Sequence, residues 1–255
     1  MLLHVREAGP LNAPTVLFLH DLGLSSTMWQ PQFERLAGSS HCLAPDLPEC
    51  GHSSAIGPFT LKDAASRVAA VIRERVPGGV AHVVGLSLGG AVALQMLRDE
   101  PEGVDHLLIS GTAKELPPTL DALHRLDERI LRLLSHERLA DFLIGPYHVT
   151  QVYRPLILAD LQQVEPEAIG HFIREMAKLR LPRNGHTPIL ITAGREEISV
   201  LQHAVYEMKR AMPGARGALV PGAGHFWNLE FADLFTQTLR SWIEDEPLPK
   251  RLLLI

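Results

Sequence analysis

Short apolar segments alternate along most of the chain with longer segments in which apolar residues recur every three or four positions. A continuous apolar run such as 15–19 predicts a strand that is covered on both faces. A periodic segment such as 61–76 predicts an amphipathic helix. The apolar runs are 15–19, 41–47, 81–87, 104–109, 188–194 and 215–220, with a short edge strand expected over 2–7. Their alternation with helices predicts an α/β fold with a doubly wound, mostly parallel sheet.

The strand pattern is interrupted between about residues 113 and 184. Four helical segments replace it, at 119–134, 135–144, 154–164 and 165–179. Four helices are too many for an ordinary crossover between two strands, so we expect an inserted helical cap over one end of the sheet. The predicted organisation is a core formed by residues 1–112 and 186–255, with a helical cap at 113–185.

The stretch Gly85-Leu86-Ser87-Leu88-Gly89 lies where a predicted strand meets a predicted helix. It fits the G-x-S-x-G pattern of a nucleophile elbow, in which flanking glycines let the strand and helix backbones pass close together. Such a turn presents the Ser87 hydroxyl above the sheet, and the free N–H groups of the first helical turn can hold an oxyanion. A glycine-rich turn with an incidental serine gives the same pattern, so other residues must show whether Ser87 is a nucleophile.

A nucleophilic serine needs a base, and that base needs an anionic group to orient it. Of the 13 histidines, His225 stands out because it follows the last predicted strand, in a glycine-rich loop at the same sheet edge as Ser87. The acid is expected after the preceding strand, where Glu196 and Glu197 follow Gly194. We favour Glu197 as the acid and retain Glu196 as the alternative.

Together these motifs resemble the α/β-hydrolase superfamily, specifically its small capped esterases and lactonases, over nearly the whole chain. His20-Asp21-Leu22-Gly23 stands where the family carries H-G-x-G, and Asp46 to Ser53 fit D-x-P-G-x-G-x-S, with Glu49 for the first glycine. The resemblance implies an α/β-hydrolase fold and an oxyanion hole formed by the backbone N–H groups of Leu22 and Leu88. It also favours Glu197, because the family acid commonly stands three residues after a strand-ending glycine.

Two positions depart from the family pattern. Asp21 replaces a glycine beside the oxyanion loop, and a glutamate replaces the usual aspartate. An Asp21 carboxylate directed into the site would repel a tetrahedral oxyanion and raise the pKa of His225, whereas one directed away would be harmless.

The resemblance implies a serine hydrolase that cleaves carboxylic esters or lactones through an acyl-enzyme, without a metal or cofactor. Leu, Ile, Phe and Met in the cap suggest a small, modestly apolar substrate. A serine at the elbow excludes relatives that use an aspartate nucleophile. Carbon–carbon bond hydrolases, cofactor-free peroxidases and small-molecule receptors that keep the triad remain alternatives.

Composition narrows the partners further. The 255 residues are 46% hydrophobic and 21% charged with a net charge of −5 and no basic block, so we expect no nucleic-acid partner. No apolar run reaches the length of a membrane span or a signal peptide core. Cys42 and Cys50 would lie about 26 Å apart on an extended chain, beyond disulfide reach, which suggests a reducing, cytoplasmic location. The oligomeric state stays open, as does whether the apolar tail 251–255 packs on the domain or contacts a partner.

Overall fold

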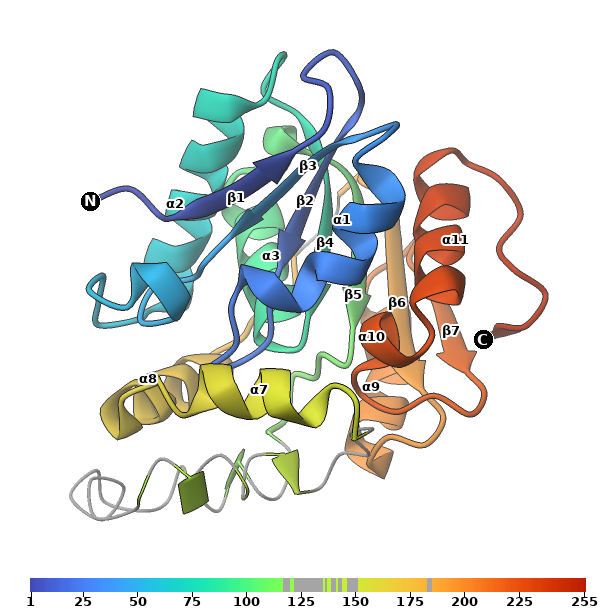
Figure 1. Cartoon of the computed structure of the whole chain (residues 1–255). Helices are drawn as coiled ribbons and strands as arrows, with labels where there is room; N and C mark the ends of the chain where they lie inside the picture. The colour runs from blue at the N-terminus through green and yellow to red at the C-terminus, as the bar shows by residue number, and fades with distance from the viewer. Residues whose placement is uncertain are drawn as a thin grey trace.

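The computed structural model contains one eight-stranded sheet in the order β1-β3-β2-β4-β5-β6-β7-β8 (Figure 1). It describes residues 1–116, 120–121, 135, 137–138, 141, 144–145, 151–182 and 185–255. The strands are β1 (Val5–Ala8), β2 (Thr15–Leu19), β3 (His41–Pro45), β4 (Ala81–Leu86), β5 (Val104–Ser110), β6 (Ile189–Gly194), β7 (Arg216–Val220) and β8 (Leu253–Leu254). Strands β2 to β7 pair in parallel, and only β1 and β8 at the two edges are antiparallel. The predicted doubly wound, mostly parallel sheet is confirmed.

Helices cover both faces of the sheet. They are α1 (Gln30–Leu36), α2 (Leu61–Arg75), α3 (Leu88–Asp99), α7 (Arg154–Leu161), α8 (Pro166–Met176), α9 (Ser199–Ala211), α10 (Trp227–Glu230) and α11 (Ala232–Ile243), with 3-10 turns η1 (Ser26–Trp29), η2 (Gly51–Ser53) and η3 (Pro101–Gly103). Helices α2 and α3 pack together on one face, and α1 and α11 on the other (Figure 1). Strands β2, β3 and β6 are buried along their whole length, as continuous apolar runs predict.

Local chemistry accounts for where α2 begins. The side chain of Thr60 accepts the backbone N–H of Asp63 at 3.1 Å, which satisfies one of the donors left unpaired at a helix start. The predicted apolar stripe of this helix is buried, including Leu61, Val68 and Ile72. The segment therefore forms a helix with one face against the sheet, as its periodicity predicts.

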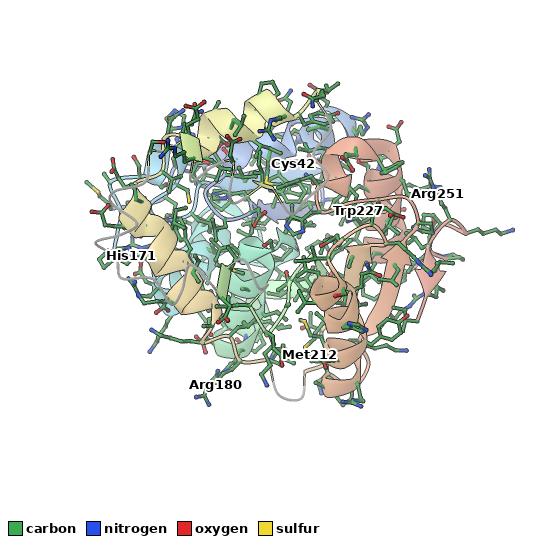
Figure 2. All side chains as sticks on the ribbon, turned by 90° about the horizontal axis from the view of Figure 1, so that it is seen from below. Cys42, His171, Arg180, Met212, Trp227 and Arg251 are labelled. Carbon is green, nitrogen blue, oxygen red and sulfur yellow. The ribbon has the colours of Figure 1, made fainter. Side chains whose placement is uncertain are left out.

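The segment between β5 and β6 carries α7 and α8, which lie across the end of the sheet (Figure 1). They correspond to the predicted helices at 154–164 and 165–179. The other two predicted helices, at 119–134 and 135–144, lie largely outside the described residues. Seen from below, His171 on α8 lies at the periphery, whereas Trp227 of α10 lies nearer the centre (Figure 2).

One expectation about the C-terminal part of the chain is wrong. β7 is not the last strand, because the tail forms β8, which pairs antiparallel with β7. The Ile255 N–H also donates to the Gly217 carbonyl at 2.9 Å, and Leu252 is buried. In this structure the apolar tail packs on the domain; two residues are too few for a strand pattern to be visible in the sequence.

Two smaller expectations concern the cysteines and the membrane. Cys42 and Cys50 are both buried free thiols. Within the described part of the chain, no helix combines the length and apolarity that crossing a bilayer requires.

Candidate active site

Ser87 lies at a sharp bend between β4, which ends at Leu86, and α3, which begins at Leu88. Its φ of 52° and ψ of −110° are unusual for a residue with a side chain, and such a conformation persists only when its surroundings hold it. The Ser87 N–H donates to the Ser110 carbonyl at 2.8 Å, and the Thr112 hydroxyl donates to the Ser87 carbonyl at 3.0 Å. The end of β5 and the segment after it thus hold the bend in place.

The glycines of the elbow are required by close backbone contacts. A Cβ on Gly85 would lie 2.5 Å from the Gly89 carbonyl oxygen, and one on Gly89 would lie 2.2 Å from the Leu19 carbonyl oxygen. No larger residue fits without a backbone shift, so the G-x-S-x-G spacing has the steric cause expected of it.

His225 follows β7 and is fully buried. Its Nδ1 lies 2.9 Å from Glu197 Oε2, while Glu197 Oε1 accepts the Gly194 N–H at 3.0 Å. The backbone contact therefore directs the other carboxylate oxygen at the imidazole. Glu196, the alternative acid, is exposed, and its backbone N–H donates to the Ala223 carbonyl at 2.9 Å. The structure brings Glu197, not Glu196, to His225.

A second histidine, His20, holds the loop after β2, which lies on the other side of the His225 imidazole. The Nε2 of His20 accepts the Leu47 N–H at 2.8 Å, which a nitrogen carrying a proton could not do. The ring is therefore neutral with its proton on Nδ1, and it donates to the Asp21 carbonyl at 2.9 Å. This fixes the backbone at Asp21 relative to the loop after β3.

The Asp21 carboxylate points into the site, the orientation in which it would repel a tetrahedral oxyanion and raise the pKa of His225. Its Oδ1 accepts the Leu22 N–H at 2.6 Å, and its Oδ2 lies 3.1 Å from His225 Nε2. Burial alone would lower the pKa of His225, but the Glu197 and Asp21 carboxylates outweigh it and raise that pKa to about 10. In this arrangement His225 is an imidazolium at neutral pH.

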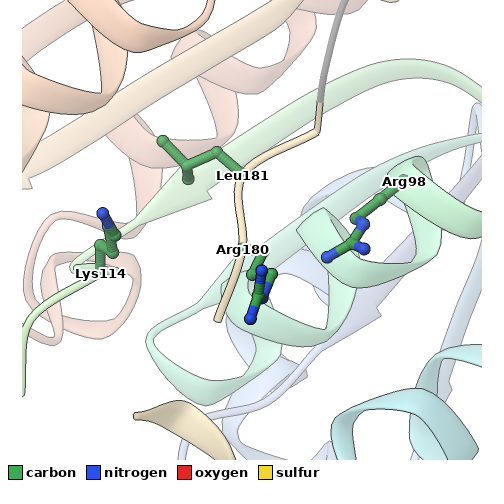
Figure 3. A pocket seen from close by; sticks show the side chains of 4 residues that line it. All are labelled: Arg98, Lys114, Arg180 and Leu181. Carbon is green, nitrogen blue, oxygen red and sulfur yellow. The ribbon is translucent and has the colours of Figure 1, made fainter. Parts of the chain in front are cut away.

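Ser87, Asp21, Leu22 and Phe226 line one cavity of about 30 Å³. This volume holds roughly one water molecule. Its remaining described walls are apolar: Leu24 from the loop after β2, and Leu120, Ile144, Ile157 and Leu161 from the inserted segment. Larger hollows exist elsewhere, including one of about 520 Å³ lined by Arg98, Lys114, Arg180 and Leu181 (Figure 3). None of the predicted site residues lines that basic hollow.

Glu49, which replaces a family glycine, shows why glycine suits its position. Its φ is 63°, in the left-handed region. Its carboxylate accepts the Phe59 N–H at 2.8 Å and lies 2.9 Å from His171 Nδ1 on α8. The glutamate therefore connects the core with the inserted segment.

Sequence reasoning missed Gly111. It has a φ of 58°, and a Cβ there would lie 2.6 Å from His225 Cε1 and 3.5 Å from Glu197 Oε1. The imidazole packs directly against this glycine. Its sequence signal is modest: a glycine immediately after the apolar run of β5.

Two clusters of side chains could hold a metal ion among the described residues. They are His4, Asp46 and His52, and His82, Asp105 and His106, and within each cluster the ligand atoms lie within 4.8 Å of one another. Asp46 already accepts the Ser26 N–H at 2.7 Å and the His52 N–H at 2.9 Å. Neither cluster includes a residue that lines the cavity over Ser87.

Comparison with known proteins shows the family of this chain. The sequence model of the alpha/beta hydrolase family matches residues 16–238, and the chain belongs to that family. An AB hydrolase superfamily protein of Gibberella zeae is 28% identical over 246 residues, covering 92% of this chain and 82% of its own. A pimeloyl-[acyl-carrier protein] methyl ester esterase of Nitrosomonas europaea is 26% identical over 249 residues, covering 91% and 96%. Among solved structures, a thermophilic esterase from Thermogutta terrifontis is similar with a TM-score of 0.80 at 23% identity, covering 95% of this chain and 93% of that one.

Proposed function

We propose that this protein is a serine hydrolase of carboxylic esters or lactones that works through an acyl-enzyme. The observation that carries the proposal is the buried pair of His225 and Glu197, joined at 2.9 Å beside a strained serine elbow. The names of its relatives, which include a methyl ester esterase, support ester chemistry in general. We assign Ser87 as nucleophile, His225 as general base and Glu197 as the group that orients the imidazole.

In the first step, neutral His225 takes the Ser87 proton on Nε2 while Ser87 Oγ bonds to the acyl carbon. The carbonyl oxygen becomes an oxyanion, which the Leu22 and Leu88 backbone N–H groups stabilise. Leu88 is the first residue of α3, so its N–H has no partner within the helix and lies at the positive end of the helix dipole. The tetrahedral intermediate collapses, the bond to the alcohol oxygen breaks, and His225 returns its proton to the departing alcohol.

In the second step, His225 removes a proton from water, and the hydroxide oxygen bonds to the acyl carbon of the Ser87 ester. Collapse of the new intermediate breaks the bond to Ser87 Oγ, which regains the proton from His225. A carboxylic acid leaves, and the residues return to their starting state. Glu197 stays ionised throughout and stabilises the imidazolium that forms in each step.

We further propose that residues 113–185 form the cap of this enzyme and set its substrate preference. The walls contributed by Ile157 and Leu161 on α7 favour a small apolar acyl or alcohol group. A cavity of about 30 Å³ is too small for an ester, so substrate entry requires these walls to move.

The decisive experiment compares Ser87→Ala with Ser54→Ala, which changes an exposed serine. Substrates are p-nitrophenyl esters of increasing chain length, with a series of lactones alongside. Ser87→Ala should lower kcat/KM by on the order of 10³- to 10⁶-fold, and Ser54→Ala should not change it. An organophosphonate should label the wild type on Ser87, as detected by mass spectrometry of the peptide. Equal rates for both variants would exclude Ser87, and a folded wild type with negligible turnover throughout would favour the receptor alternative.

A further inference from the structure

The Asp21 carboxylate contacts both groups that the proposed reaction needs on the oxyanion side. Leu22 N–H is a proposed oxyanion donor, and Asp21 Oδ1 accepts it at 2.6 Å. His225 Nε2 is the proposed base nitrogen, and Asp21 Oδ2 lies 3.1 Å from it. An anionic acyl oxygen cannot share the Leu22 N–H with a carboxylate, because the two negative charges repel at contact distance. A nitrogen paired with a carboxylate is also not free to take the Ser87 proton.

We propose that Asp21 is a built-in occupant of the oxyanion hole, which must leave the Leu22 N–H to the acyl oxygen of the substrate and His225 Nε2 to the Ser87 proton before hydrolysis begins. The inference rests on the proposed function, because it gives these two groups their catalytic meaning. On this inference, Asp21 sets how readily the site becomes able to hydrolyse a substrate.

The charges around His225 decide its resting state. The loop after β6 contributes Glu197 at Nδ1 and the loop after β2 contributes Asp21 at Nε2, so two carboxylates flank one imidazole. From α7, Asp160 accepts hydrogen bonds from Ser25, in the loop after β2, and from Thr27, in η1, at 2.8 and 3.3 Å. The neighbouring segment after β5 presents Gly111, which carries no charge, against the ring. Both contacting charges therefore favour the imidazolium, the form that cannot accept the Ser87 proton.

Displacement must come from the Asp21 side chain, because its backbone is held. The Asp21 carbonyl accepts from His20 Nδ1 at 2.9 Å and from the Leu24 N–H at 3.1 Å, and its N–H donates to Met28 Sδ at 3.4 Å. The side chain borders the small apolar cavity roofed by α7, and only 9% of it is exposed. Movement of that roof would admit water and weaken the attraction between carboxylate and imidazolium. Opening for substrate and release of Asp21 are thus favoured together.

The test compares Asp21→Asn and Asp21→Ala with the wild type, using kcat/KM for p-nitrophenyl butyrate between pH 5 and pH 11. Asn keeps the size and an oxygen for Leu22 N–H but removes the charge. It should move the acid limb of the profile down by about 1 to 3 pH units. Ala removes both contacts and should raise kcat/KM at pH 7 by about 10-fold or more, as a limb shift of at least one unit implies. Asp160→Asn neutralises a nearby half-buried carboxylate that contacts residues following β2 but not His225, and should leave the limb in place.

A second measurement separates failure of this inference from failure of the proposed function. NMR titration of the His225 imidazole in Ser87→Ala, with and without Asp21→Asn, reports the pairing without any turnover. A lower His225 pKa in the double variant supports the pairing even if no variant hydrolyses esters. The inference is overturned if Asp21→Asn leaves both the NMR titration and the acid limb unchanged. It is also overturned if folded Asp21→Asn and Asp21→Ala lose activity as Ser87→Ala does, because Asp21 would then assist the reaction.

Discussion

The loops after β6 and after β2 approach one imidazole with the same hydrogen-bond pattern. Glu197 joins the Gly194 N–H, at 3.0 Å, to His225 Nδ1, at 2.9 Å. Asp21 joins the Leu22 N–H, at 2.6 Å, to His225 Nε2, at 3.1 Å. The Gly194 N–H has no part in the proposed chemistry, whereas the Leu22 N–H is needed for the oxyanion. On the proposed mechanism, the same pattern of contacts therefore supports the reaction at Glu197 and opposes it at Asp21, because the two carboxylates occupy different N–H groups.

The two loops also differ in how firmly they are enclosed. The Glu197 side chain is fully buried, and Gln202 Nε2 donates to its backbone carbonyl at 2.6 Å. The Asp21 side chain is 9% exposed and borders the cavity over Ser87. The Glu197 side chain is thus held in place, whereas the Asp21 side chain can move into the cavity once the cavity opens.

The largest expected effect comes from neutralising Glu197. Glu197→Gln can present its amide N–H₂ to His225 Nδ1, which would favour the wrong tautomer of the imidazole. We expect kcat to fall by on the order of 10⁴-fold in steady-state ester hydrolysis. Glu196→Gln, on the neighbouring exposed residue, is the matched control and should behave as the wild type. The opposite ranking of these two variants would assign the acid to Glu196.

A smaller loss is expected from disturbing the ring on the same side. Gly111→Ala places a Cβ about 2.6 Å from His225 Cε1, so the imidazole must shift. A displacement of this kind costs about 10²-fold in kcat. Gly214 has a φ of 89° and open space around its Cα, so Gly214→Ala tests the left-handed backbone without the clash. Equal losses in the two variants would attribute the effect to backbone strain alone.

The Asp21 side is tested by the pH dependence of stability. Because the folded pKa of His225 is raised to about 10, its contribution to stability is complete below about pH 6.5 and is lost as pH rises toward 10. The wild type should therefore lose more melting temperature between pH 6.5 and pH 10 than Asp21→Asn, in which one of the two flanking charges is gone. Thermal unfolding by circular dichroism at several pH values measures this. Parallel curves would mean that Asp21 does not hold the imidazolium.

The smallest effect, on thermal stability, concerns the hydrogen bond between the loop after β2 and α7. The Ser25 hydroxyl donates to Asp160 at 2.8 Å, so Ser25→Ala leaves a half-buried carboxylate with one donor fewer. Such a loss is worth about 1 kcal/mol, which corresponds to about 2–4 °C in melting temperature for a chain of this size. Differential scanning calorimetry beside Ser54→Ala measures the difference. No difference between the two would mean that this tie does not stabilise the fold.

The sequence predicts the main sheet, its flanking helices and the elbow because these follow from local periodicity and from glycine spacing. Ser87 ends a predicted strand, Glu197 and His225 each follow one, and the carboxyl ends of parallel strands meet at one edge. The orientation of Asp21 is not predictable in this way. It depends on the contact between His20 and the Leu47 N–H, which lie 27 positions apart. Gly111 escaped attention for the same reason, since its role is visible only against His225.

The left-handed Glu49 has a practical consequence for engineering. Its carboxylate connects the core with His171 on α8, and this contact helps to offset the strain of the left-handed backbone at Glu49. A glycine at position 49 would relax the backbone and at the same time remove the contact with His171, in the middle of α8. Libraries that aim to change how the inserted segment sits on the core could therefore begin at this position, because a change there removes a contact to α8 and no proposed reacting group.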